Sequence, residues 1–232
     1  MSWVERARQA SAVASLNLVE NDSVVGLGSG RTVSFVIKEL GKKVKREDLN
    51  IKVVPTSIQT EILSAKNGLN LTNLLEHPEL DLAIDGADQV EVRTLDLLKG
   101  AGGALAREKV VAFAAKKFVI VVDEKKVAKH GLNGKVPVEV LPFGVGFVMR
   151  EIARIGGRPT LRESRGKLGP VVTDNGNYII DIDFGRIYYP KKLDRSLRTI
   201  PGITETGLFL GLADIVYIGR RDRRVQTLRG KR

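Results

Sequence analysis

The sequence contains no cysteine and only two histidines among its 232 residues. Without cysteine the chain has no disulfide, no thiolate zinc site and no cysteine nucleophile, and nothing in it requires an oxidising compartment. His77 and His130 have no partners at ligand spacing, which argues against a histidine metal site and a Ser-His-Asp triad. We therefore expect no metal site, and we expect both histidines at the surface.

Long apolar runs are also absent. No stretch approaches the roughly 18 apolar residues of a membrane-spanning helix, and residues 1–11 have no apolar core of signal-peptide length. Hydrophobic residues still make up 43% of the chain, enough for the core of one large domain or of a large and a small one. We expect a cytoplasmic protein without a membrane partner.

Acidic residues are outnumbered, 27 against 38 Lys and Arg, which gives a formal net charge of +11. Much of this excess lies in residues 220–232, which hold seven basic residues and one acidic residue. The rest of the chain carries a mild positive excess that attracts small anions. Neither a patterned basic groove nor aromatic platforms accompany the charge, so we expect a solvated basic terminus and no specific nucleic-acid partner.

The first half of the chain alternates short apolar runs with helical periodicity. An opening helix is indicated by apolar residues spaced three and four apart up to Leu18 and by the capping-box pair Ser2 and Glu5. Further strands are predicted at residues 23–28, 51–55, 82–85 and 118–122, and further helices at 32–40, 57–66 and 104–115. Gly41 is expected to end the helix at 32–40. This alternation is typical of crossover units around a buried, mostly parallel sheet.

After about residue 131 the pattern changes to that of half-buried antiparallel strands with one or two helices. Strands are predicted at 136–141, 158–164 and 178–184, and helices at 147–155 and 193–198. The apolar run 213–218 is expected to rejoin the first sheet. We therefore predict an α/β fold in which a large domain, residues 1–131 plus 206–232, carries an inserted smaller α+β domain, residues 132–205.

The first turn suited to chemistry is GLGSGRT at residues 26–32, between a buried strand and a helix. Unpaired backbone N–H groups and the helix dipole make such a turn a phosphate or hydroxyl cradle. A tight turn that merely needs glycine has the same appearance. The dinucleotide fingerprint requires a third glycine where Arg31 stands, and no lysine precedes Thr32 as a P-loop would require.

The second turn, DGAD at residues 85–88, places two carboxylates at the carboxyl end of a predicted strand, where open parallel sheets bind ligands. Like charges about 4 Å apart repel by roughly 4 kcal/mol at an effective dielectric near 20. Burial of both ionised groups therefore requires a nearby cation or hydroxyl donors, and Lys99 is the candidate cation. Two solvated turn aspartates are the alternative.

The third motif, KGAGGALAREK at residues 99–109, is a glycine-rich loop that enters a helix. It places Glu108 in the early turns, near the ligand end of the sheet, where a carboxylate above a bound sugar acts as a base. The alternative is an ion pair on an exposed helix face. Lys125 and Lys126 follow another predicted strand and suit a phosphate contact, with a solvated lysine pair as the alternative.

Six motifs occur in order along nearly the whole chain: GLGSGRT, VPTS (54–57), DGAD, KGAGGALAREK, VVDEKK (121–126) and PGITETGLF (201–209). Together they closely resemble type A ribose-5-phosphate isomerase. The resemblance implies a Rossmann-like domain with a smaller ferredoxin-like domain, assembled as a homodimer or homotetramer. It also implies interconversion of ribose 5-phosphate and ribulose 5-phosphate in the non-oxidative pentose phosphate pathway, without a cofactor.

The resemblance assigns roles to particular residues. Glu108 matches the general base of the family, while Asp85, Asp88 and Lys99 match its catalytic turn and lysine. The positions that match substrate contacts are Ser29, Gly30, Arg31, Thr32, Asp85, Gly86, Ala87, Asp88, Lys99, Gly100, Ala101, Gly102 and Lys126. These residue types fit the chemistry, because isomerisation needs a base for a C–H proton and electrophilic help for the developing enediolate oxygen.

Two departures from the family pattern and two rival functions stand beside this interpretation. Arg31 replaces a small hydroxyl residue, and Ala101 stands where glycine is common. The main alternative is a sugar-phosphate-binding sensor on the same fold. The complete acid–base set argues against a sensor, as does the lack of a helix-turn-helix before the first helix. A nicotinamide-dependent oxidoreductase is disfavoured by Arg31 within the fingerprint.

Overall fold

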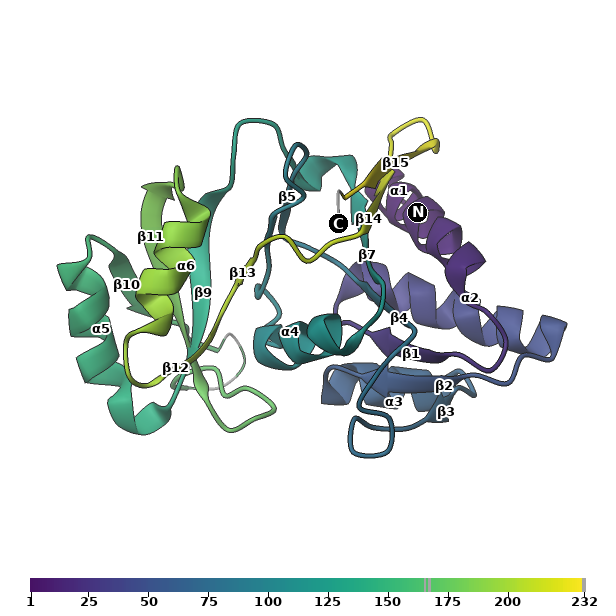
Figure 1. The fold of residues 1–232 in the computed structure, drawn as a ribbon, viewed down its shortest axis with the longest axis horizontal. Coiled ribbons are helices and arrows are strands. Elements are labelled where there is room, and N and C mark those ends of the chain that lie inside the picture. The colour runs from purple at the N-terminus through teal and green to yellow at the C-terminus, as the bar shows by residue number, and fades with distance from the viewer. Residues whose placement is uncertain (165, 167, 231–232) are drawn as a thin grey trace. The chain divides into compact units, whose positions relative to one another are not determined.

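A computed structural model describes residues 1–164, 166 and 168–230. The chain divides into two compact units (Figure 1). The first unit comprises Met1–Ala87, Arg107–Val127 and Gly211–Arg232, and the second comprises Asp88–Ala106 and Ala128–Leu210. The division differs from the predicted domains chiefly at residues 88–106, which lie with the second unit, so the chain passes between the units more often than one insertion requires.

The first unit is built on a seven-stranded sheet in the order β15-β14-β7-β4-β1-β2-β3. Its strands are β1 (Val24–Leu27), β2 (Lys52–Pro55), β3 (Asn70–Leu71), β4 (Leu82–Asp85), β7 (Phe118–Asp123), β14 (Ile215–Gly219) and β15 (Val225–Arg229). Its helical segments are α1 (Trp3–Ser15), η1 (Leu16–Leu18), α2 (Arg31–Glu47), α3 (Ile58–Lys66), most of α4 (Leu105–Ala114) and η2 (Glu124–Lys126). Every described strand pair in this sheet is parallel except β14 with β15. The predicted α/β fold is confirmed.

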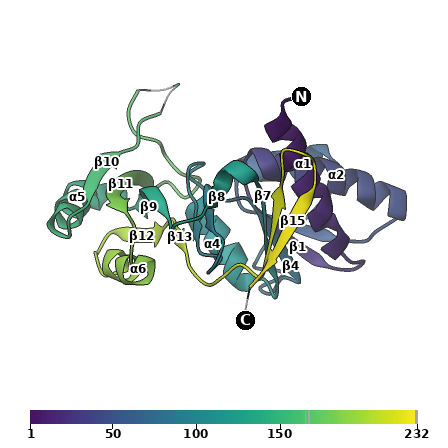
Figure 2. The same ribbon diagram turned by 90° about the horizontal axis from the view of Figure 1, so that it is seen from above.

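Helices cover both faces of this sheet, which is why its central strands are buried almost without interruption. Val25 and Leu27 of β1 pack in one core with residues of α1 and α2. Alternate residues of a strand face opposite sides, and Gly26 lies against Val111 of α4 on the other side. Figure 2 shows α1 and α2 on one side of the strands. The capping box of α1 is confirmed, with Ser2 and Glu5 exchanging hydrogen bonds.

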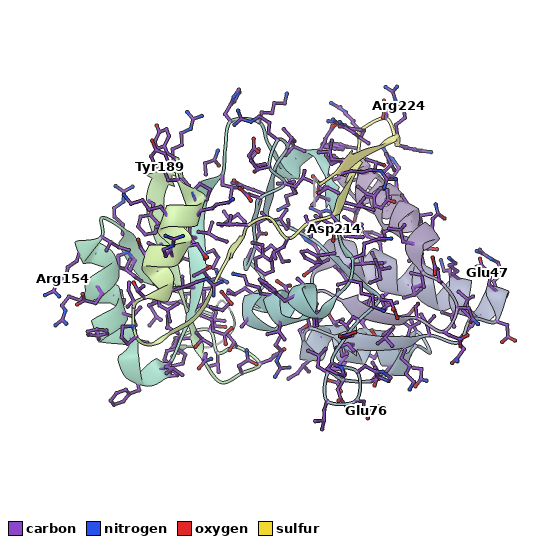
Figure 3. The ribbon with its side chains drawn as sticks, in the orientation of Figure 1. Glu47, Glu76, Arg154, Tyr189, Asp214 and Arg224 are labelled. Carbon is purple, nitrogen blue, oxygen red and sulfur yellow. The ribbon has the colours of Figure 1, made fainter. Side chains whose placement is uncertain are left out.

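Two predictions about local structure were wrong in this unit. Helix α2 does not end at Gly41 but continues to Glu47, because the missing Cβ makes room for the backbone of Asn67: an added Cβ would lie 2.6 Å from its carbonyl oxygen. The basic terminus is not only a solvated tail, since residues 225–229 form β15, which pairs with β14. Arg224 lies at the tip of this hairpin (Figure 3).

The second unit has an antiparallel sheet in the order β10-β11-β9-β12, packed against two helices as predicted for an α+β domain. These elements are β9 (Asn133–Val140), η3 (Pro142–Gly144), α5 (Val145–Arg154), β10 (Arg158–Leu161), β11 (Tyr178–Arg186), α6 (Pro190–Arg198) and β12 (Ile203–Thr206). Inward residues of β9 and β11, among them Val138 and Ile180, share a core with Val148 and Leu197. A second small sheet has the order β13-β6-β5-β8, formed by β5 (Gln89–Glu91), β6 (Leu97–Leu98), β8 (Val127–Ala128) and β13 (Leu208–Phe209).

The helices are short or polar relative to a bilayer. Within residues 1–164, 166 and 168–230, no helix is both long and apolar enough to cross a membrane. The longest, α2, carries charged residues along its exposed side.

Candidate active site

Several of the predicted site residues of the first unit lie at one edge of its sheet. Strands β1, β4 and β7 run parallel, with Leu27 opposite Ile84 and Asp85 opposite Ile120. The turn after β1 and the turn after β4 therefore emerge at the same carboxyl edge, where open parallel sheets bind ligands. Lys126 follows β7 within η2 and reaches this edge as well.

Asp85 is the last residue of β4 and is 2% exposed. Its Oδ1 accepts hydrogen bonds from the backbone N–H groups of Gly86, at 2.7 Å, and Ser29, at 3.3 Å. Gly28 makes this position possible, because a Cβ on residue 28 would lie 1.9 Å from the same oxygen. The glycine turn after β1 and the aspartate turn after β4 are thus packed directly against each other.

Replacing Gly28 with alanine is expected to displace the Asp85 carboxylate and to lower kcat/KM at least about 100-fold, the usual cost of a 1 Å misplacement in an active site. Steady-state kinetics on the purified variant measures this. Gly146→Ala is the matched control. Gly146 is a residue of α5, and a Cβ added there meets nothing within 4 Å. A Gly28→Ala enzyme as active as this control would contradict the argument.

A network of hydroxyl groups joins the ends of β1 and β2, and the sequence did not reveal it. The Ser29 hydroxyl lies 2.7 Å from the Ser57 hydroxyl, 3.0 Å from that of Thr56 and 3.3 Å from that of Thr60. Thr60 in turn donates to the carbonyl of Gly28 at 2.7 Å. The side chain of Ser29 therefore stabilises the turn. The VPTS motif at the end of β2, which contains Thr56 and Ser57, is the sequence feature that could have indicated this network.

Helix α2 begins at this edge, and its first backbone N–H groups, at Arg31 and Thr32, have no acceptor within the helix. A cavity of about 450 Å³ between α1 and α2 is lined in part by Glu5, Arg8, Arg31, Ser34 and Lys38. Arg8 is paired with Asp123 at 2.9 Å. In the described part of the chain the side chains of Arg31 and Lys38 have no ion-pair partner. Arg8 and Lys38 were missed in the sequence, although Lys38 follows Arg31 by seven residues on one helix face.

Glu108 lies in the first turn of α4 and is 6% exposed. The far end of α4 is at the amino edge of the sheet, because Leu80, just before β4, bonds to Ala114 and Lys116, each at 2.8 Å. The helix therefore runs against the strands, and its first turn faces the carboxyl edge. The expected alternative, an exposed surface ion pair at Glu108, does not describe this buried side chain.

Asp88 and the glycine-rich loop belong to the second unit. Lys99 is 3% exposed, its N–H donates to the Gly207 carbonyl at 2.9 Å, and its ammonium lies 5.3 Å from the centre of the Phe209 ring. Asp88 Oδ2 accepts a hydrogen bond from the N–H of Ala101 at 2.8 Å. Asp88 and the loop that follows Lys99 therefore form one hydrogen-bonded arrangement, to which Gly100 and Gly102 belong by sequence.

Neither histidine belongs to the motifs that carry the candidate site residues. His77 Nε2 is 3.1 Å from the Lys52 ammonium, and His130 is exposed. Among the residues that the structure describes, no group of three or more His, Cys, Asp or Glu side chains is arranged to hold a metal ion.

Comparison with known proteins gives the family. The protein-family model described as Ribose 5-phosphate isomerase A (phosphoriboisomerase A) matches residues 52–223 of this chain. The Ribose-5-phosphate isomerase A of Methanosarcina acetivorans is 46% identical over 221 residues, which are 95% of this chain and 93% of that protein. The human Ribose-5-phosphate isomerase is 40% identical over 227 residues, 96% of this chain and 73% of its own.

Solved structures agree over the whole chain. Ribose 5-phosphate isomerase A from Methanocaldococcus jannaschii superposes with a TM-score of 0.91 at 38% identity, covering 96% of this chain and 98% of that one. A D-ribose-5-phosphate isomerase in complex with phospho-erythronic acid reaches 0.93 at 39% identity, covering 99% and 100%. The fold and the sequence thus define an α/β sugar-phosphate isomerase. The chain belongs to the ribose 5-phosphate isomerase A family, and the predicted enzyme class is confirmed.

Proposed function

We propose that this chain interconverts D-ribose 5-phosphate and D-ribulose 5-phosphate through an enediolate, with Glu108 as the general base. The observation that carries the assignment is that two nearly buried carboxyl groups, Glu108 and Asp85, both belong to the carboxyl edge of the first sheet. A base at a ligand-binding edge and a fixed hydroxyl-orienting carboxylate are what aldose–ketose chemistry requires.

In this mechanism Glu108 takes the proton from C2 of the open-chain aldose and returns it to C1 of the enediolate. Lys99 stabilises the negative oxygen that develops as the proton leaves. Asp85 and Asp88 orient hydroxyl groups and exchange O–H protons, including those moved during ring opening. Asp88 follows Asp85 by three residues, so the chain alone keeps their Cα atoms within about 11 Å.

The substrate is held by main-chain groups as much as by side chains. We assign hydroxyl contacts to the backbone at residues 86–87 and 100–102, apart from the N–H groups of Gly86 and Ala101, which already donate to Asp85 and Asp88. The phosphate is assigned to the start of α2, beside the cavity that Arg8, Arg31 and Lys38 line. A helix N-terminus next to cationic side chains is suited to a dianion. Lys126 supplies a further cation at the same edge.

The double variant Arg31→Ala/Lys38→Ala tests the phosphate assignment. We expect KM for ribose 5-phosphate to rise about tenfold, which corresponds to a loss of about 1.4 kcal/mol of binding, while kcat changes little. Lys42→Met is the control, because Lys42 lies on α2 but pairs with Glu39 at 2.9 Å outside the cavity. An unchanged KM in the double variant would refute the assignment of the phosphate to this cavity.

The reaction itself is tested by adding ribose 5-phosphate to the purified chain and following the ketose. Formation of ribulose 5-phosphate without any added cofactor is expected. A sensor built on this fold would bind the sugar phosphate without converting it, and a nicotinamide-dependent oxidoreductase would need its nucleotide. Neither rival predicts a ketose under these conditions.

We further propose that the chain acts in the cytoplasm as a homodimer or homotetramer. Large apolar side chains are exposed in the second unit, among them Phe143, Phe147, Leu141 and Val172. Large exposed apolar side chains are one sign of an interface. Light scattering on the purified chain measures the assembly, and a monomeric mass at micromolar concentration would contradict it.

A further inference from the structure

Arg162 connects the antiparallel sheet of the second unit to the glycine-rich loop. Its Nη1 donates hydrogen bonds to the carbonyl oxygens of Gly100, at 2.8 Å, and Ala101, at 3.2 Å. These carbonyls lie directly after Lys99 in the chain. No sequence motif singled out Arg162, which lies 62 residues from Gly100.

The other side of the guanidinium is fixed on the sheet. Nε and Nη2 of Arg162 bind the two carboxylate oxygens of Asp181, at 2.8 and 2.5 Å. Asp181 lies in β11, opposite Thr160 of the neighbouring strand β10. A bidentate pair of this kind sets the plane of the guanidinium as well as its position. Arg162 is therefore a rigid donor directed at the loop rather than a mobile surface side chain, and it is only 16% exposed.

The contact acts on a particular peptide group. The Gly100 carbonyl and the Ala101 N–H belong to the same planar trans unit, so they point in opposite directions. Arg162 binds the carbonyl, and Asp88 Oδ2 accepts from the N–H at 2.8 Å. The peptide is thus held from both sides. Gly100 has φ +106°, where glycine alone is unstrained, and its carbonyl also accepts the N–H of Gly103 at 3.0 Å. The two side chains therefore add to a backbone turn in fixing how this peptide is oriented.

We propose that Arg162 is a positioning residue for the isomerisation. By orienting the Gly100–Ala101 peptide, it sets the direction of the Asp88 carboxylate and the path of the backbone that leaves Lys99. This inference rests on the catalytic roles proposed above for Asp88 and Lys99. Asp181 belongs to the same device, because without it the guanidinium has no fixed plane.

The same strands carry a matched ion pair that makes no such contact. Arg158 binds Asp183 at 2.8 Å across β10 and β11, where the two residues are directly opposite each other. Both side chains are more exposed, at 77% and 36%. In the described part of the chain, Asp183 is the ion-pair partner of the Arg158 guanidinium. Arg158→Met therefore removes an arginine–aspartate pair between β10 and β11 while the bonds to the loop are kept.

The test compares Arg162→Met with Arg158→Met in steady-state kinetics on the full chain. For Arg162→Met we expect kcat to fall about 10- to 100-fold with KM changed less than about threefold, since a misplaced catalytic group costs turnover rather than binding. Arg158→Met should keep wild-type kcat. Arg162→Lys should recover part of the loss at most, because an ammonium cannot bind Asp181 and both carbonyls in the same plane.

A double-mutant cycle separates positioning from simple loss of stability. If Arg162 acts through Asp88, adding Arg162→Met to an Asp88→Ala enzyme should cost less than about threefold further in kcat. Full additivity, or an Arg162→Met kcat equal to that of Arg158→Met, would overturn the inference. Should Arg162→Met prove unstable, Asp181→Asn gives the same comparison against Asp183→Asn.

The design also distinguishes this inference from the proposed function. An Asp88→Ala enzyme with full kcat would refute the role of Asp88 and, with it, the route by which Arg162 acts. An inactive Asp88→Ala enzyme beside a fully active Arg162→Met enzyme would refute the positioning role alone.

Discussion

Glu108→Gln should lower kcat for ribose 5-phosphate about 10²- to 10⁴-fold, the usual contribution of a general base. Glutamine keeps the shape of the side chain and its hydrogen-bonding capacity but does not accept a proton at neutral pH. Because Glu108 is in the first turn of a packed helix, the substitution should leave the fold intact. Circular dichroism and the Tm check the fold, and a coupled assay for the ketose measures kcat.

Proton exchange makes this test specific to the base. In D₂O the wild-type enzyme should introduce deuterium at the carbon that exchanges its proton with the base, as seen by proton NMR. The exchange should fall in Glu108→Gln together with kcat. Glu61→Gln is the matched control, because Glu61 occupies the first turn of α3 and is exposed. Exchange at the wild-type rate in Glu108→Gln would assign the base to another residue.

The central elements of the first sheet were predictable because their signals are local. Strands such as Phe118–Asp123 are continuous apolar runs, and the opening helix carries both its apolar spacing and its capping box. Strands of two or three residues, such as Leu97–Leu98, are too short to show a period of two. Helix α2 extended past its expected end because the space at Gly41 is filled by Asn67, a residue of another helix end.

The candidate site also has parts with local sequence signals and parts without them. Its motifs follow strands, so the sequence alone placed Asp85 and the turn after β1 at one edge. The contacts that hold those motifs are long-range and left no local signal. Ser29 is bonded to hydroxyls 27 or more residues away, and Arg162 reaches a loop more than 60 residues away. Only a folded chain brings such partners together, because periodicity reports which face a residue occupies and not what it meets there.

Lys99→Met should lower kcat about 10²- to 10³-fold, the size of effect seen when one group that stabilises a developing oxyanion is removed. Methionine has nearly the length of lysine without its charge, so packing against Phe209 is kept while the enediolate oxygen loses its positive partner. Burial makes the charge effective, since Lys99 is 3% exposed and little water competes with it.

The pattern of the loss distinguishes a catalytic ammonium from a binding one. A group that acts only on the transition state lowers kcat and kcat/KM equally, whereas a ground-state contact raises KM with kcat unchanged. Lys116→Met is the control, because that lysine pairs with Asp81 at 2.8 Å at the amino edge of the first sheet. Lys99→Arg should remain impaired, since a planar guanidinium does not place its charge where the ammonium stood. A Lys99→Met enzyme with wild-type kcat and a raised KM would move this residue from oxyanion stabilisation to substrate binding, and the enediolate would then need another electrophile.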